Sequence, residues 1–148
     1  MILSEGPVPD RIGIAISTYN GPITAPMRDA AVRVLETAGV GDIPIFEVPG
    51  ALELPVAALA LIRKLDCAGV IAIGAVIKGE TDHYEHVSRE ATRGIADVAL
   101  QTGRPVANAL LTVHEYDHAV ERSLPGPGNK GGEAASAVLA VTRRLASL

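Results

Sequence analysis

The sequence predicts an α/β fold in which a four-stranded parallel sheet carries helices on both faces. Segments with strand-like and helix-like hydrophobic periods alternate along the chain, which is the pattern of right-handed βαβ crossovers. The apolar run at residues 68–77 has the composition of a strand buried on both faces. The 148 residues, 48% of them hydrophobic, are enough for one domain with a substantial core.

The first predicted elements are a short β-branched strand over residues 11–17 and the helix that follows it. The hydroxyl of Thr24 can cap this helix, and Pro26 is tolerated in a first turn. Gly39 supplies a stop signal after the helix. One helical face then carries Met27, Ala31, Val34 and Ala38.

The later elements repeat this alternation. A helix with Pro55 in its first turn follows the second strand, and Gly103 ends the helix after the third strand. A Gly/Pro-rich loop at residues 125–130 separates the last two helices. The predicted bounds are 43–48, 68–77 and 105–113 for strands two to four, and 53–65, 83–102, 115–124 and 132–148 for the later helices.

Composition and charge exclude several classes of function. The formal net charge is 13 − 17 = −4, no basic run is present and only 3% of residues are aromatic, so no nucleic-acid partner is expected. The single cysteine, Cys67, is expected to be a small buried residue. Because one cysteine allows no disulfide within the chain, an intracellular, cytoplasmic protein is favoured. Residues 1–10 lack the features of a signal peptide, and no apolar run could span a bilayer, so no membrane association is expected. We expect residues 1–10 to form an N-terminal arm and residues 11–148 a single domain.

Two predicted helical stretches are unusually apolar for a domain of this size. Residues 51–62 contain a single charged side chain, Glu53, and residues 134–142 contain none. A helix of a lone small domain should present a polar face to water. The sequence therefore predicts that helix surface is buried between copies of the chain.

Residues that could carry chemistry follow every predicted strand. Because the carboxyl ends of parallel strands meet at one edge of a sheet, a ligand site is expected there. In the segment 79–83, a hydroxyl and an imidazole meet where a strand ends and a helix begins, a place that favours anions and proton transfer. A phosphorylated substrate that needs a proton moved would suit this place. The residues concerned are Tyr19 and Asn20, the segment 49–53, the segment 79–83, and Thr112 with His114.

Two cations flank the glycine-rich loop before the last helix. Arg122 can bind a phosphate bidentately, whereas Lys130 acts as a point charge. The loop is not a Walker P-loop, because Gly131 stands where Ser or Thr is required. No G-x-G-x-x-G motif follows a strand, so a dinucleotide-binding fold is unsupported.

The sequence leaves a structural role open for each of these residues. The four histidines form two pairs, three and four residues apart, a spacing that can ligate zinc, but no acidic signature accompanies them. We therefore expect no metal and no cofactor. As structural alternatives, Tyr19 could be a half-buried turn residue, Glu53, Thr81 and Asp82 could cap helices, and Arg122 and Lys130 could be solvated surface residues.

Four motifs, in order and spacing, resemble those of the lumazine synthase family, whose members catalyse the penultimate step of riboflavin biosynthesis. The resemblance covers nearly the whole chain from Arg11. Arg122 and Lys130 stand eight residues apart, as in the family, and Glu133 follows Lys130 by three. The motifs are Tyr19-Asn20, PGALELP at 49–55, GAVIKGETDHYEHV at 74–87 and ERSLPGPGNKGGEAA at 121–135.

The resemblance implies a flavodoxin-like three-layer sandwich. It also implies assembly into pentamers, sometimes into decamers or sixty-subunit icosahedral shells, with active sites between adjacent subunits of a pentamer. The implied reaction condenses 5-amino-6-(D-ribitylamino)uracil with 3,4-dihydroxy-2-butanone 4-phosphate to give 6,7-dimethyl-8-ribityllumazine, phosphate and water. Neither a metal nor an organic cofactor takes part, so the implied partners are these small molecules and other copies of the chain.

The resemblance assigns roles residue by residue. His83 would transfer protons, and Tyr19 would stack on the pyrimidine. Arg122 of the neighbouring subunit would bind the phosphate. The other implied substrate-binding residues are Asn20, Ala51, Leu52, Glu53, Val76, Ile77, Gly79, Glu80, Thr81 and Asn108, together with Lys130 and Glu133 of the neighbouring subunit.

The chain departs from the family pattern at three places. Leu52 stands where an aromatic residue is frequent, so a stacking contact is lost there, although a main-chain contact survives. Asn108 stands where many members place an aromatic residue against the substrate, although Asn also occurs there. The stretch 112–115 replaces a common Thr-Thr, and His114 within it has no assigned role. The alternatives are a non-catalytic flavin or ribityl-compound binder on the same fold, a structural shell protein, and a metal hydrolase that uses the histidines.

Overall fold

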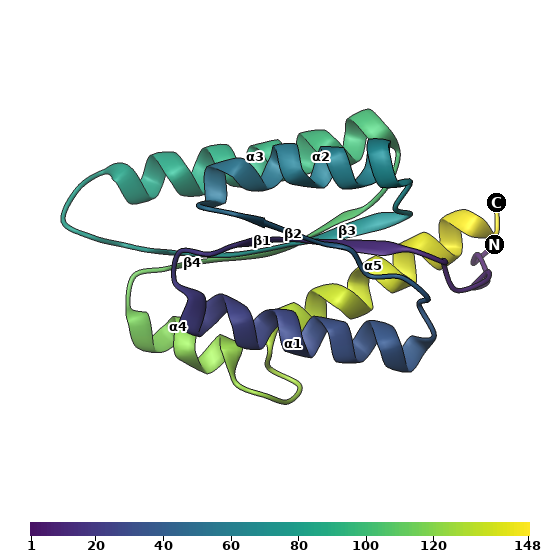
Figure 1. The fold of residues 1–148 in the computed structure, drawn as a ribbon, viewed down its shortest axis with the longest axis horizontal. Helices are drawn as coiled ribbons and strands as arrows, with labels where there is room; N and C mark the ends of the chain where they lie inside the picture. The colour runs from purple at the N-terminus through teal and green to yellow at the C-terminus, as the bar shows by residue number, and fades with distance from the viewer.

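The computed structural model describes residues 1–148 and confirms the predicted α/β class (Figure 1). Its four strands are all parallel and lie in the order β2-β1-β3-β4, so that β2 and β4 form the two edges. The strands are β1 (Ile12–Ser17), β2 (Ile45–Val48), β3 (Gly69–Ile77) and β4 (Val106–Val113). The helices are α1 (Gly21–Ala38), the short 3-10 helix η1 (Ala51–Glu53), α2 (Leu54–Leu65), α3 (His83–Thr102), α4 (Tyr116–Ser123) and α5 (Lys130–Ala146).

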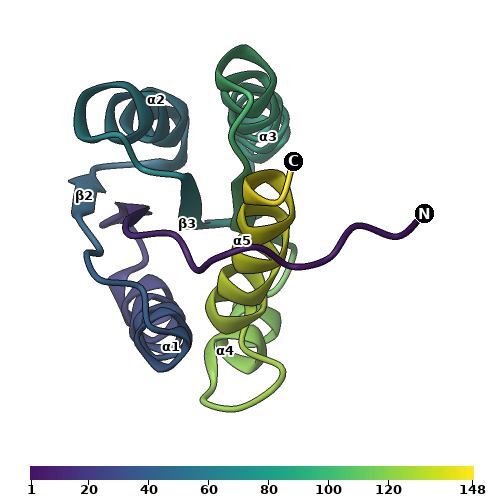
Figure 2. The same cartoon turned by 90° about the vertical axis from the view of Figure 1, so that its right-hand side faces the viewer.

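The helices form two layers that enclose the sheet. Helices α2 and α3 cover one face, and α1, α4 and α5 cover the other (Figures 1 and 2). Because alternate residues of a strand point to opposite faces, β3 supplies both cores. Ile71 and Ile73 pack with α1 and α5, whereas Val70 and Ala72 pack with α2 and α3. This three-layer sandwich is the flavodoxin-like arrangement that the sequence predicts.

Helix α1 begins at Gly21, so the predicted cap at Thr24 is wrong. The residue before the helix is Asn20, whose φ of 59° is left-handed, a conformation that Asn tolerates better than most residues. Thr24 is buried inside the helix, and its hydroxyl donates to the Ser17 carbonyl at 3.0 Å. Pro26 also lies inside the helix. A tight turn therefore joins β1 to α1 and places residues 18–20 at the end of the sheet.

The other bounds agree with the predicted ones to within two residues. Strand β2 begins at Ile45 rather than at residue 43, and the start of the second helical segment is the short helix η1. Helix α5 begins at Lys130 rather than at residue 132, because the side-chain oxygen of Asn129 accepts hydrogen bonds from the Gly131 and Gly132 N–H groups at 2.9 and 3.2 Å.

The first nine residues contain no helix or strand, and the chain end extends away from the sheet (Figure 2). Glu5 and Gly6 nevertheless attach this segment to α5. The Gly6 N–H donates to the Arg143 carbonyl at 2.9 Å, and Arg143 Nε donates to the Gly6 carbonyl at 2.9 Å. The Glu5 carboxylate lies 3.0 Å from the same guanidinium.

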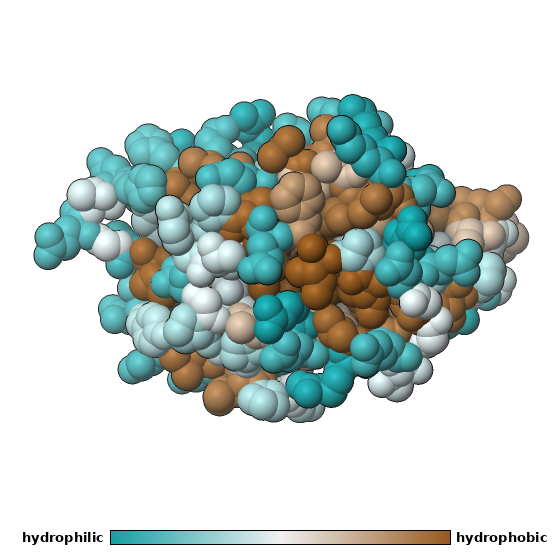
Figure 3. All heavy atoms as spheres, in the orientation of Figure 1, coloured by the Kyte–Doolittle hydropathy of each residue, from teal (hydrophilic) through white to brown (hydrophobic).

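Several large apolar side chains face water on the β2 side of the molecule (Figure 3). Ile45 and Phe46 of the edge strand are 45% and 42% exposed, and Val56 on α2 is 64% exposed. Contiguous apolar surface of this kind marks interaction sites, which motivates the assembly proposed below. No helix combines the length and the apolar character that crossing a bilayer requires.

Cys67 is buried, as the sequence predicts, with no exposed surface. Burial raises the pKa of its thiol to about 11. The thiol therefore stays protonated near neutral pH, which is the behaviour of a small core residue and not of a nucleophile.

Candidate active site

The structure divides the predicted site residues into two groups. The first, here called the loop group, comprises the last residues of β3 and the segments that follow β1, β2 and β3 at the carboxyl end of the sheet. The second, here called the groove group, comes from β4, α4 and α5. The loop group is Tyr19, Asn20, Ala51, Leu52, Glu53, Val76, Ile77, Gly79, Glu80, Thr81 and His83, and the groove group is Asn108, Arg122, Lys130 and Glu133.

Tyr19 and Glu53 lie beside each other over Gly50. A Cβ atom at Gly50 would be 3.3 Å from two ring carbons of Tyr19 and 3.6 Å from Glu53 Oε2. The Tyr19 N–H donates to the Pro49 carbonyl at 3.0 Å, which ties the turn after β1 to the turn after β2. An exposed flat ring and a carboxylate are thus presented together, so this corner can stack on a heterocycle and accept hydrogen bonds from hydroxyl groups.

Asn20 connects the turn after β1 to the central strand β3. Its amide nitrogen donates to the Ala75 carbonyl at 2.9 Å, and its amide oxygen has no partner within the chain. Ala51 is buried, whereas Leu52 is half exposed. The Asn20 oxygen and the main chain around Ala51 are therefore the polar groups that this part of the edge offers to a ligand.

His83 is the first residue of α3, and its side chain is exposed with no partner within the chain. Its N–H lies 3.3 Å from the Thr81 hydroxyl, which accepts the hydrogen bond. Asp82 precedes the helix but makes no side-chain cap, so the alternative that Asp82 caps α3 is wrong. A Cβ atom at Gly79 would meet nothing within 4 Å. The segment therefore combines an open main chain at Gly79 with a free, exposed imidazole at His83.

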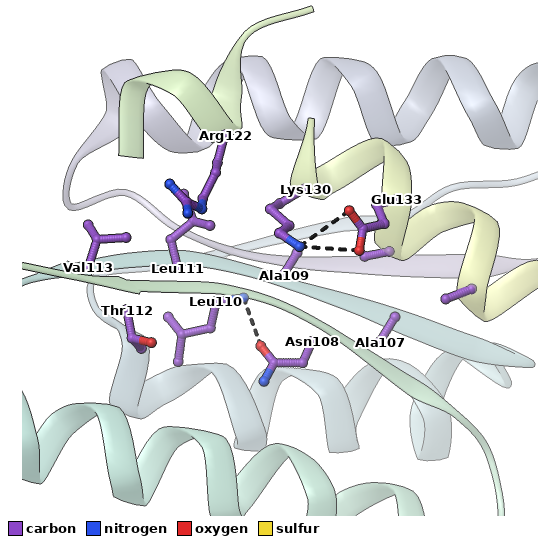
Figure 4. A pocket seen from close by; sticks show the side chains of 12 residues that line it. Ala107, Asn108, Ala109, Leu110, Leu111, Thr112, Val113, Arg122, Lys130 and Glu133 are labelled. Atoms are coloured by element: carbon purple, nitrogen blue, oxygen red, sulfur yellow. Dashed lines mark hydrogen bonds and ion pairs between the residues drawn. The ribbon is translucent and has the colours of Figure 1, made fainter. Parts of the chain in front are cut away.

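The groove group lines a cavity of about 420 Å³ along the edge strand β4 (Figure 4). Arg122, Lys130 and Glu133 reach over one face of the strand, whereas Asn108 and Thr112 point to its other face. The cavity therefore follows the free edge of the sheet and offers polar groups on both sides of it. Its lining is Ala107, Asn108, Ala109, Leu110, Leu111, Thr112, Val113, Arg122, Lys130, Glu133, Ala134 and Ala137.

The two cations of the groove differ in their partners. Lys130 Nζ lies 3.2 and 3.3 Å from the two carboxylate oxygens of Glu133. Arg122 Nη1 donates to the His118 carbonyl at 2.9 Å, a contact one turn back on its own helix, and the guanidinium has no carboxylate partner. An oriented guanidinium with free N–H groups suits a phosphate, because the fork binds two oxygens at once.

Asn129 is a supporting residue that the sequence reasoning missed. It is buried at 1% exposure, and its amide nitrogen donates to the carbonyls of Ser123 and Leu124 at 2.8 and 3.2 Å. Its amide oxygen caps α5, so one side chain joins the end of α4 to the start of α5. These two helices carry Arg122 and Lys130. An Asn just before a helix is a cap signal that could have identified it.

Gly131 holds the start of α5 against α1. A Cβ atom here would lie 2.0 Å from the Met27 carbonyl oxygen, so no other residue fits without displacing a helix. The close approach fixes where Lys130 enters the groove.

The cavity along β4 does not bring the two groups together. None of the loop group lines the groove along β4. A second hollow, of about 980 Å³, lies at the opposite end of the sheet and contains none of the predicted site residues. No three His, Cys, Asp or Glu side chains come close enough together to hold a metal ion. The proton-transfer candidate His83 therefore does not line the cavity that contains the phosphate-binding candidate Arg122.

Residues 10–146 match a family model described as 6,7-dimethyl-8-ribityllumazine synthase. The chain belongs to this family. The match confirms the resemblance drawn from the four motifs and the enzyme class that it implies. Two curated 6,7-dimethyl-8-ribityllumazine synthases are similar over most of the chain. The enzyme from Syntrophus aciditrophicus is 42% identical over 127 residues, which cover 84% of this chain and 82% of the relative. The enzyme from Methylobacillus flagellatus is 44% identical over 140 residues, which cover 93% of this chain and 91% of the relative.

One solved structure, a LacI-family transcription regulation repressor from Corynebacterium glutamicum, aligns at a TM-score of 0.30 and 14% identity. The alignment covers 76% of this chain and 59% of the repressor chain. Similarity at that level supports no inference about the fold or function of this member of the lumazine synthase family.

Proposed function

We propose that the chain condenses 5-amino-6-(D-ribitylamino)uracil with 3,4-dihydroxy-2-butanone 4-phosphate to give 6,7-dimethyl-8-ribityllumazine, phosphate and water. Membership of the family supports 6,7-dimethyl-8-ribityllumazine as the product. The separation of the site residues into a loop group and a groove group supports an active site shared by two subunits. The groove that carries the free guanidinium contains none of the loop residues, and the acid–base candidate is among those absent. Placing the groove of one subunit against the loops of the next would complete the site. This complementarity is the observation on which the proposal rests.

Arg122 binds the phosphate of the butanone. Its guanidinium has no carboxylate partner and is oriented by the His118 carbonyl, so little ordering is needed when an anion arrives. Gly79, Glu80 and Thr81 of the adjacent subunit add main-chain N–H groups and a hydroxyl at the start of α3, where the helix dipole favours negative charge. Both contacts hold the phosphate as it becomes a leaving group.

His83 moves the protons. Amine attack on the ketone gives an imine with loss of water. A carbon-bound proton is then removed, phosphate leaves, and the second nitrogen attacks the remaining carbonyl, so that the ring closes with loss of a second water. A free, exposed imidazole at the start of α3, directly after the phosphate-binding residues 79–81, can take and return these protons. Holding both reactants together supplies a further part of the rate enhancement.

The remaining residues hold the pyrimidine and its ribityl chain. Tyr19 stacks on the ring, and Asn20 and Glu53 accept hydrogen bonds from the ribityl hydroxyls together with the main chain of Ala51 and Leu52. The exposed ring of Tyr19 beside the Glu53 carboxylate supports this assignment. Val76 and Ile77 line the ring pocket, while Asn108, Lys130 and Glu133 close it from the neighbouring subunit.

The assembly that brings the two groups together is a ring of five subunits, which can build decamers or sixty-subunit shells. The exposed apolar side chains around β2 and α2 support burial between copies. The arm at residues 1–10, the single domain at 11–148 and the cytoplasmic location stay predictions.

A non-catalytic binder of a ribityl compound is the second candidate on the same fold. Such a binder would need Tyr19 and Glu53 but neither a free imidazole nor an unpaired guanidinium. The presence of both favours catalysis.

The test mixes the purified protein with the two substrates and follows the fluorescence of the lumazine product. The proposal expects turnover well above the uncatalysed rate. Binding of the pyrimidine without turnover would overturn the proposal in favour of the non-catalytic binder.

A further inference from the structure

The loop that carries the predicted phosphate contacts is attached to the end of β4 at both of its ends. At its start, the Lys78 N–H donates to the Val113 carbonyl at 2.9 Å. Just beyond its end, the ring of Tyr84 meets the ring of His114 edge to face, with centroids 5.6 Å apart and planes at 77°. Two consecutive residues of one segment, Val113 and His114, therefore hold the two ends of the loop at 79–83.

Few other contacts hold the start of α3. The side chain of Asp82 makes no cap, and the only side-chain hydrogen bond at this helix start is the 3.3 Å contact from the His83 N–H to Thr81. The first buried residue of α3 is Val87, one turn after His83. The Tyr84–His114 ring contact joins α3 to the end of β4 one residue after His83. Loss of this contact would remove one of the supports of the first turn of α3.

His114 is in the right place because of how β4 ends. Val113 is the last strand residue and points into the core at 9% exposure, so the next residue emerges at the surface of the carboxyl edge. Edge-to-face packing is the geometry that two rings prefer at this separation. The imidazole of His114 has no hydrogen bond within the chain that would give it another role.

We propose that His114 is a positioning residue, which holds Tyr84 and thereby the loop 79–83 and the imidazole of His83 in place for catalysis. This inference rests on the proposed function for its kinetic consequence. His114 itself touches neither substrate; it acts through Tyr84. Its predicted effect is confined to the steps that need the loop, which are phosphate binding and proton transfer. Pyrimidine contacts at Tyr19 and Glu53 lie on other turns and should not change.

The kinetic test compares His114→Ala with His114→Phe, which keeps a ring. His114→Ala should lower kcat/KM for the butanone phosphate about 3- to 10-fold, the factor that corresponds to one aromatic pair, with KM for the pyrimidine unchanged. His114→Phe should restore most of the loss. Tyr84→Ala should match His114→Ala, and the double variant should fall no further, because both changes remove one contact. His86→Ala, an exposed histidine on the same helix without a ring contact, is the matched control.

A second measurement needs no turnover. Hydrogen exchange of the peptide covering residues 78–86 should be faster in His114→Ala than in the wild type and in His86→Ala, because the first turn of α3 opens more often. Equal exchange in all three proteins would overturn the inference. His114→Ala with wild-type kinetics in an active enzyme, or His114→Phe as slow as His114→Ala, would also overturn it. Absence of lumazine formation by the wild type would overturn the proposed function alone, since the exchange result still decides whether His114 holds the loop.

Discussion

At the amino end of the sheet, charged side chains from neighbouring segments pair with one another, whereas at the carboxyl end most of them have no partner. Arg11 lies 2.6 Å from Asp42, and Arg104 lies 2.8 Å from Asp66. At the other end, His83, Glu53 and Arg122 form no ion pair, and Lys130 with Glu133 is the exception. The two ends belong to the same strands, so the difference comes from the turns and not from the sheet.

The difference indicates what each end is for. An exposed ion pair contributes little, about 0–1 kcal/mol, so pairing at the amino end mainly orients the connections there. A charged side chain without a partner contributes even less to stability, but it is free to bind a charged ligand. Changes at the carboxyl end should therefore alter turnover without destabilising the fold. Changes at the amino end should have only small effects on both turnover and stability.

The largest effect is expected from His83→Ala. The variant should lower kcat about 10²- to 10⁴-fold, the range that a positioned acid–base group contributes. Its free energy of unfolding should stay within about 0.5 kcal/mol of wild type, because the side chain is exposed and unbonded. Steady-state assays and chemical denaturation measure the two effects, with His86→Ala as control. Unchanged turnover would remove His83 from the mechanism.

Arg122→Ala should have the next largest effect. Loss of a charged hydrogen-bonding partner should raise KM for the butanone phosphate about 10- to 100-fold, with a small change for the pyrimidine. Arg122→Lys should recover part of the loss, since it keeps the charge but not the fork. A rise in KM for the pyrimidine alone would contradict the role of Arg122 in phosphate binding.

Asn129→Ala should be an exception among the carboxyl-end variants and should destabilise the fold, because Asn129 is a buried structural residue. Removal of its buried cap and its two donated hydrogen bonds should lower the free energy of unfolding by about 1–3 kcal/mol. Urea denaturation measures the loss, and Asn129→Asp, which keeps the capping oxygen, is the control. A stability equal to wild type would mean that water replaces these bonds without loss.

The smallest effect is expected from Asp42→Asn at the amino end. Arg11 and Asp42 are each about half exposed, so the free energy of unfolding should fall by less than about 1 kcal/mol. Turnover should equal that of the wild type in the same assay. A clear loss of turnover would show that the two ends are coupled.

Much of the fold follows from local signals in the sequence, and the errors have physical causes. The alternation of strand and helix periods predicts the element order, and the two central strands, β1 and β3, are the ones buried on both faces. The start of α1 was wrong because the Thr24 hydroxyl bonds to Ser17, a contact that depends on the turn geometry and not on the local pattern. Asn129 was missed as a cap because the predicted helix started two residues late.

The candidate site was only partly predictable for a different reason. Strand ends identify the loop group, since the parallel topology follows from the alternation of elements. The groove group depends on β4 being an edge strand, which only the strand order β2-β1-β3-β4 reveals. The contact of His114 with Tyr84 joins residues thirty positions apart and has no periodic signal at all.

The most direct test of the central claim, that one site takes His83 from one chain and Arg122 from its neighbour, is subunit mixing. Equal amounts of His83→Ala and Arg122→Ala chains are unfolded, refolded together and assayed against each variant refolded alone. The assay uses butanone phosphate well below the wild-type KM, where both variants alone should be nearly inactive. With random assembly, about a quarter of the sites receive both intact side chains, so turnover should rise from near zero to about a quarter of wild type. A mixture no more active than the mean of the two variants would contradict the account and place both residues in a site within one chain.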